Sequence, residues 1–141
     1  MPANIHFFYL SQCPALRDRN KLKAFLPTLF RQEKKVLSTL TYIFCSDRYL
    51  LNINRSYLKH DNYTDIMTFY LSADPSCIEG EIYISIERVR DNARINNVTI
   101  KEELHRVIFH GALHLCGYKD KTKLKKNEMK KKENKYLKQY L

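Results

Sequence analysis

Two histidines stand four residues apart in the stretch HGALHLCGYKD, residues 110–120. On a helix, residues at this spacing share one face with Cβ atoms about 5–6 Å apart, so both imidazoles could reach one ion. Gly117 follows three residues after His114 and can adopt the positive φ that turns a chain back towards the helix. Asp120 is the first carboxylate beyond that turn. Because a catalytic Zn²⁺ centre takes three protein ligands and keeps one open position, we expect His110, His114 and Asp120 to bind a metal.

The same residues also admit other interpretations. The two histidines lie among Val107, Ile108, Leu113 and Leu115, so they could be hydrogen-bonded core side chains, with Asp120 an ordinary surface residue. The small Gly111 favours the metal site, because it would leave room for a substrate beside His110. It disfavours a zinc peptidase, since the H-E-x-x-H motif has its general-base Glu at this position.

The rest of the chain predicts the elements that must position this set. Strands are expected at 4–10, 39–46, 65–71 and 81–85, the last two paired as a hairpin around a loop at 72–80. Helices are expected at about 20–35, after a capping Asp47, at 86–96 and at 99–116, where Thr99 and Glu102 form a capping box. The tail from Lys123 is also helix-prone, with contacts to the body expected from Leu124, Met129, Tyr136, Leu137 and Tyr140.

This order of elements predicts an α/β fold of the layered α+β type. We expect residues 1–141 to form a single small domain, a four-stranded mixed sheet covered by helices. The metal site would lie at the end of a C-terminal helix, and a Lys-rich helical tail would occupy about 121–141.

Charge and cysteine content narrow the functional class. The net charge is +10, and residues 119–138 contribute ten Lys and three acids, a local balance of +7. Such a local excess indicates either a surface for a phosphate backbone or a lysine-rich helix kept in solution by its charge. The four cysteines show no CxxC spacing, and no apolar stretch is long enough to span a bilayer. We therefore expect a cytoplasmic protein with reduced thiols and no membrane association.

The stretch HGALHLCGYKD resembles the signature of the YbeY family, metal-dependent endoribonucleases of ribosomal RNA maturation, which reads H-G-x-L-H-L-x-G-Y-D-H. Upstream, NRSYLKHDNYTDIMTF (54–69) resembles the family block N-x-x-Y-R-x-x-D-x-P-T-D-V-L-S-F, and EGEIYIS (79–85) resembles its L-G-D-I-x-I-S strand. Asn92-Ala93 stands where the family has Q-A. The resemblance runs from about Leu51 to Asp120.

This resemblance implies a single-strand-specific endoribonuclease that matures the 3′ end of small-subunit ribosomal RNA and acts in ribosome quality control. The implied partners are ribosomal RNA, the small ribosomal subunit and its assembly proteins, and the protein would act as a monomer. The alternative is a ribosome-associated assembly factor with a structural metal and weak or no catalysis. A metallopeptidase is the third candidate.

Two departures from the family pattern bear on this function. Asp120 replaces the third histidine, and its oxygen donor fits Zn²⁺ but also admits Mn²⁺ or Mg²⁺. Leu58 replaces an arginine to which the resemblance assigns phosphate binding, so Arg55, Lys59 and His60 are candidates to bind RNA in its place. No side chain of the signature is an evident general base, which leaves the metal-bound water or the RNA 2′-hydroxyl.

Four other residues need an interpretation. Asp65 is a candidate acceptor that orients a ligand, although an Asp at a strand start more commonly caps a turn. Tyr118 could stack on a base, but we favour a role in pinning the turn to the core. His105 is expected to point away from the ligand face and to be a surface or core histidine. Cys116 is also expected to face away and to serve packing.

Overall fold

The structure is a computed structural model that describes residues 3–58 and 64–141. Its strands are β1 (Asn4–Tyr9), β2 (Leu37–Cys45), β3 (Ile66–Tyr70) and β4 (Ile78–Ser85). Its helices are α1 (Arg19–Gln32), α2 (Asp47–Ile53), α3 (Ile86–Asn96), α4 (Ile100–Leu115) and α5 (Lys123–Tyr140). A turn of π-helix, η1 (Asn54–Leu58), continues α2.

The four strands form one mixed sheet in the order β1-β2-β4-β3. β2 pairs in parallel with both β1 and β4, whereas β3 and β4 form the predicted antiparallel hairpin. β3 is an edge strand of this sheet, so one side of its backbone faces away from the other strands. The predicted α/β class and the four-stranded mixed sheet are confirmed.

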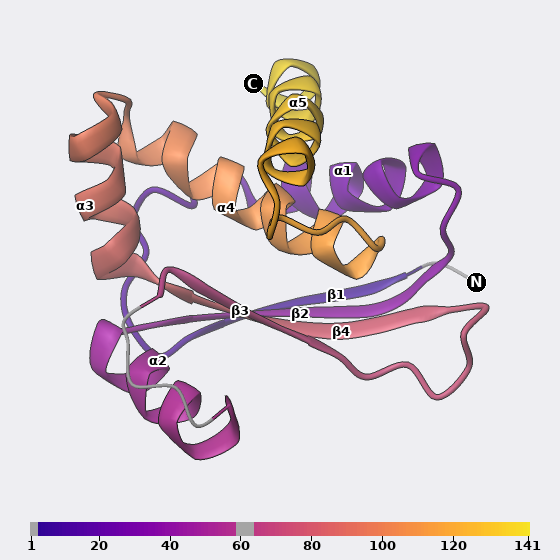
Figure 1. Ribbon diagram of the computed structural model, residues 1–141, viewed down its shortest axis with the longest axis horizontal. Coiled ribbons are helices and arrows are strands. Elements are labelled where there is room, and N and C mark those ends of the chain that lie inside the picture. Colours follow the sequence, from indigo (N-terminus) through magenta and orange to yellow (C-terminus); the bar gives the residue numbers. More distant parts are fainter. Residues whose placement is uncertain (1–2, 59–63) are drawn as a thin grey trace.

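Helices α1, α4 and α5 lie on one side of the sheet, and α2 lies on the other (Figure 1). Alternate residues of β2 and β4 face the first group of helices, so Tyr42, Phe44, Ile82 and Ile84 are fully buried. The hydroxyl of Tyr42 donates to the backbone oxygen of Ile108 in α4 at 2.8 Å, which fixes the helix against the sheet. The core therefore supports α4, the helix that carries both candidate histidines.

β4 begins at Ile78, three residues earlier than predicted, within the segment expected to be a loop. Gly80 lies inside this strand, and a Cβ there would be 2.7 Å from Leu115 Cδ1. A glycine inside a strand often marks such a close approach. The absent side chain lets the last turn of α4 pack directly on the sheet.

The start of α2 also differs from the prediction. Ser46, not Asp47, is the N-cap, and its hydroxyl accepts from the Tyr49 amide at 3.1 Å. Asp47 lies in the first turn, where its carboxylate accepts from the Ser85 hydroxyl and from Arg88 at 2.7 Å. Its carboxylate therefore joins α2 to α3 instead of capping a helix.

The Lys-rich tail forms the predicted helix, α5, with Thr122 as its N-cap. Met129, Tyr136, Leu137 and Tyr140 are buried as expected, but Leu124 is 77% exposed and does not contribute to the core. None of the helices in the described part of the chain combines the length and the apolar composition needed to cross a bilayer.

Candidate metal centre

His110 and His114 lie on the last two turns of α4. The helix starts at the N-cap Thr99, whose side chain accepts from the Glu102 amide at 3.0 Å, which is one of the two bonds of the predicted capping box. Gly111, next to His110, faces the sheet, where a Cβ would lie 2.9 Å from side-chain atoms of Ile66 and Ile82. The expectation that Gly111 leaves room for a substrate is therefore wrong, because the glycine is needed for helix–sheet packing.

The two imidazoles face each other through their Nε2 atoms, which are 2.9 Å apart. Each Nδ1 has an oxygen partner: the carboxylate of Glu133 at 2.5 Å from His110, and the backbone oxygen of Tyr118 at 2.9 Å from His114. Because a carboxylate and a carbonyl only accept, each Nδ1 donates, and each neutral ring keeps its Nε2 lone pair. Two lone pairs thus point into one space, an arrangement that a shared cation stabilises.

Asp120 brings a third donor to the same space. Gly117 has φ 105°, the conformation expected of it, and the Tyr118 amide returns to the Leu113 oxygen at 3.1 Å. Beyond this turn, Asp120 Oδ2 lies 3.4 Å from Nε2 of His110 and 3.5 Å from Nε2 of His114. Metal–ligand bonds of about 2.1 Å at tetrahedral angles place donor atoms about 3.4 Å apart. The three side chains can therefore hold one ion, as their spacing predicted.

The electrostatics of the pair favour one bound positive charge. Burial on its own lowers the pKa of His110, but the carboxylates of Glu133, Asp120 and Asp65 outweigh it, and the net pKa is raised. Burial and the neighbouring His110 lower the pKa of His114. A positive charge on His110 therefore disfavours protonation of His114. The carboxylates of Glu133, Asp120 and Asp65 would stabilise a bound divalent cation in the same way as they stabilise protonated His110.

Tyr118 fixes the turn that brings Asp120 to the histidines. Its hydroxyl donates to Glu33, the residue that follows α1, at 2.6 Å. Glu33 also accepts from the Tyr136 hydroxyl of α5 and from Lys132 at 3.2 Å. One buried carboxylate therefore joins α1, the turn and α5, and the favoured role of Tyr118 in pinning the turn is confirmed.

The other residues singled out in the sequence are not among the three converging donors. Asp65 accepts from the Asn92 amide at 3.5 Å, and burial raises the pKa of its carboxyl, while His110 acts to lower it. Arg55 is exposed on η1. Lys59 and His60 fall outside the described residues. His105 and Cys116 are buried in packing positions, as expected.

A groove of about 540 Å³ runs from His114 along β3. Its walls combine cationic, aromatic and small polar side chains, among them Lys119, Lys121, Phe69, Tyr70 and Asn54. The two lysines flank Asp120 in the sequence, so the positive charge lies directly beside the three donors. The sequence had indicated a basic surface, but it had not assigned these two lysines to the site.

Glu133 was also missed from the sequence. It stands in a lysine run, 23 residues after His110, and local spacing does not connect the two. One signal was available: with Met129, Tyr136 and Tyr140 it occupies the buried face of α5, where a carboxylate needs a partner.

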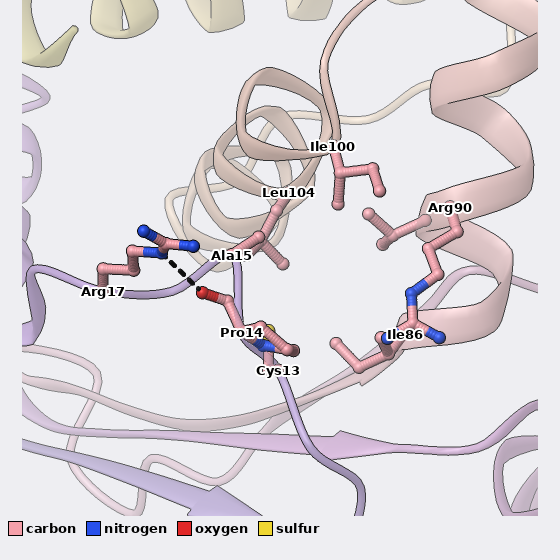
Figure 2. A pocket seen from close by; sticks show the side chains of 9 residues that line it. Cys13, Pro14, Ala15, Arg17, Ile86, Arg90, Ile100 and Leu104 are labelled. Atoms are coloured by element: carbon pink, nitrogen blue, oxygen red, sulfur yellow. Dashed lines mark hydrogen bonds between the residues drawn. The ribbon is translucent and has the colours of Figure 1, made fainter.

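A second depression, of about 230 Å³, lies against the first turns of α4 (Figure 2). Ile86, Ile100 and Leu104 line it, and at its rim Arg17 donates to the Pro14 oxygen at 3.3 Å. Burial raises the pKa of the Cys13 thiol there to about 11, so the thiol is a poor nucleophile at neutral pH. This depression lacks the converging donors seen at the other end of α4.

Comparisons with known proteins show the family to which the chain belongs. A family model described as Endoribonuclease YbeY matches residues 13–141. An Endoribonuclease YbeY from Cytophaga hutchinsonii is 51% identical over 92% of this chain and 91% of its own, and one from Amoebophilus asiaticus is 44% identical over 96% and 92%. The solution structure of TM1509 from Thermotoga maritima superposes with a TM-score of 0.68 at 29% identity, covering 96% of this chain and 88% of that one. The chain therefore belongs to the endoribonuclease YbeY family.

Proposed function

We propose that this protein is a metal-dependent endoribonuclease whose ligands are His110, His114 and Asp120. The convergence of two Nε2 atoms and one carboxylate oxygen, at 2.9–3.5 Å from one another, carries the proposal. Both Nδ1 atoms are already engaged, so only the Nε2 atoms are available to an ion. Three ligands leave a tetrahedral ion one position for water or a phosphate oxygen.

The bound metal is proposed to be one divalent ion, Zn²⁺ in the first place. Two imidazoles and one carboxylate form a donor set used by catalytic zinc sites, and the carboxylate also admits Mn²⁺ or Mg²⁺. When bound, such an ion polarises a phosphoryl oxygen and lowers the pKa of water.

The side chains of the groove supply the rest of the proposed chemistry. Lys119 and Lys121 hold the phosphates that flank the cleaved bond, the role that the family arginine would have at Leu58. The other candidates for RNA binding remain Arg55, Lys59 and His60. Phe69 and Tyr70 offer surfaces on which unpaired bases can stack, which favours single-stranded RNA. Apart from the proposed ligand His114, the described residues that line the groove include no histidine, aspartate or glutamate, so the proposal assigns no side-chain general base.

The biological substrate is proposed from the family resemblance. It is the 3′ region of small-subunit ribosomal RNA, cut during maturation and ribosome quality control, with the small subunit and its assembly proteins as partners. The protein would work in the cytoplasm as a monomeric single domain spanning residues 1–141. The local +7 charge of residues 119–138 supports an RNA partner.

The proposal is tested with His114→Ala and, as a matched control, His6→Ala, which removes an exposed histidine of β1. Each protein is purified, its metal content is measured, and its cleavage of 3′-extended small-subunit ribosomal RNA is followed. We expect His114→Ala to lose both metal and cleavage and His6→Ala to keep both. Metal loss with unchanged cleavage would contradict the proposal, because a contaminating nuclease would then explain the activity.

Asp120 distinguishes the nuclease from the alternative, an assembly factor with a structural metal. The alternative predicts that Asp120→Ala alters only stability and leaves ribosome association and growth intact. The nuclease proposal predicts loss of cleavage by folded Asp120→Ala protein.

A further inference from the structure

Glu133 is a buried carboxylate on a helix otherwise rich in lysine. Its side chain is 8% exposed, and it lies on the face of α5 that packs against α4. A buried carboxylate is costly unless its oxygens are paired, so its position calls for a specific set of partners.

Both oxygens of Glu133 have such partners on α4. Oε2 accepts from Nδ1 of His110 at 2.5 Å, and Oε1 accepts from Nη1 of Arg106 at 3.0 Å. Arg106 also donates to the side chain of Asn134 at 2.8 Å, so the guanidinium contacts two neighbouring residues of α5. The Glu133 carboxylate therefore has one orientation, and it presents a fixed negative acceptor to His110.

The two proposed ligands depend on different parts of the chain. His114 is oriented by the backbone oxygen of Tyr118, four residues further on in the same turn. His110 is oriented by a side chain from α5, 23 residues away. A charged acceptor at Nδ1 fixes the ring tautomer and increases the basicity of Nε2.

We propose that Glu133 is a positioning residue of the metal centre, and that through it the docking of α5 on α4 is coupled to metal affinity. This inference rests on the proposed binding of a metal by His110, His114 and Asp120. The inference gives α5 a role in forming the metal centre. The lysine-rich composition of this helix does not indicate such a role. Coupling is reciprocal, so a bound metal also stabilises the docked helix.

The test compares Glu133→Gln, which removes the charge at nearly constant volume, with Arg106→Met. The second variant breaks the other contact between Glu133 and α4 but leaves His110 in place. Lys131→Gln, at an exposed α5 position, is a further control. Zn²⁺ affinity is measured by competition with a chromophoric chelator, and thermal unfolding of each metal-free protein shows that it is folded.

We expect Glu133→Gln to weaken Zn²⁺ binding by about 10–100-fold. Arg106→Met removes the contact that holds the Glu133 carboxylate but not its contact with His110, so it should weaken binding less, and Lys131→Gln should stay within about threefold of wild type. Equal Zn²⁺ affinities for Glu133→Gln and wild type would overturn the inference. A loss in Arg106→Met as large as in Glu133→Gln would also overturn it, because loosened docking of α5 would then explain the effect without the contact to His110. Failure of wild type to bind Zn²⁺ would overturn the metal centre itself, and this inference with it.

A second measurement reads the tautomer directly. Nitrogen-15 NMR of the metal-free protein at alkaline pH should show His110 with its proton on Nδ1 in wild type. Glu133→Leu, which removes the acceptor, should move His110 towards the Nε2–H form and leave His114 unchanged. An unchanged tautomer of His110 would overturn the positioning role.

Discussion

His110, His114 and Asp120 show how little backbone a three-donor site requires. One helical turn supplies the two imidazoles, and Gly117 reverses the chain so that Asp120 reaches both. The carboxylate is the chain's departure from the family signature, yet its oxygen lies where a third imidazole nitrogen would be needed. Exchanging this carboxylate for the signature histidine should therefore alter which metal is bound more than whether one is bound.

Changing Asp120 to His restores the signature ligand and should raise the preference for Zn²⁺ over Mn²⁺ by about tenfold or more, because imidazole is the softer donor. Competition titrations with both metals measure the ratio, and Asp120→Asn, which keeps the shape but loses the charge, serves as the control. A ratio that is the same in Asp120→His and wild type would show that Asp120 is not a ligand.

Changing Gly117 to Ala should cost about 1 kcal/mol in the free energy of unfolding, since alanine is strained at φ 105°. Nothing lies within 4 Å of the added Cβ, so the cost comes from the backbone alone. Gly111→Ala should cost more, about 1–3 kcal/mol, because its Cβ would collide with Ile66 and Ile82. Urea denaturation of both variants checks the order, and the reverse order would contradict it.

At the scale of elements, the centre depends on contacts between segments far apart in the sequence. Gly80 lets α4 approach β4, Glu33 joins α1 to the turn and to α5, and Glu133 joins α5 to His110. Each contact uses a single side chain or the absence of one. Substitutions at these positions should therefore affect the site although none of them replaces a proposed metal ligand.

Glu33 predicts a pH dependence of stability. Burial on its own would raise the pKa of this carboxyl, but hydrogen bonds from Tyr118, Tyr136 and Lys132 outweigh it, so the net pKa lies below the usual 4.5. A carboxyl with a lowered folded-state pKa stabilises the fold above its unfolded-state pKa, and this contribution is lost as the pH falls through the folded value. Glu33→Gln should cost about 1–3 kcal/mol at neutral pH, and the difference from wild type should shrink below about pH 4.5. Urea denaturation from pH 3 to 7 measures it, and a constant difference would contradict the assignment.

The groove beside β3 predicts a salt-dependent contact with RNA. Lys121→Gln should weaken binding of single-stranded RNA and lower the slope of log K against log salt concentration by about 0.7–1, since one phosphate contact is lost. Lys23→Gln, on α1 away from β3, is the matched control and should leave the slope unchanged. Equal slopes for Lys121→Gln and wild type would exclude Lys121 from the interface.

Local spacing predicted what lies within one helix and its following turn: His110, His114, Gly117 and Asp120, together with the cap at Thr99. It could not predict partners such as Glu133 or Glu33, because they are brought to the site by tertiary packing alone. It placed the start of β4 three residues too late, because the loop expected at 72–80 took in residues that pair in the strand. It also misread Gly111, whose neighbours across the sheet are not visible in the sequence.

At the scale of the whole molecule, the core holds β2 and β4 beneath α4, and α5 closes the far side of that helix (Figure 1). The candidate metal centre lies where α4, the turn and α5 meet. A ligand that binds only the folded state stabilises it, by about 2.7 kcal/mol at a concentration of 100 Kd. Zn²⁺ should therefore slow amide exchange in α5 as well as in α4, and His114→Ala should abolish both effects. Slower exchange confined to α4 would contradict the coupling.

The central claim is that one ion is bound by His110, His114 and Asp120. A crystal structure of the Zn²⁺-loaded protein with anomalous data at the zinc edge tests it most directly. The prediction is one zinc peak about 2.0–2.2 Å from Nε2 of each histidine and from an Asp120 oxygen. A peak elsewhere, or one held by the histidines with Asp120 turned away, would contradict the claim.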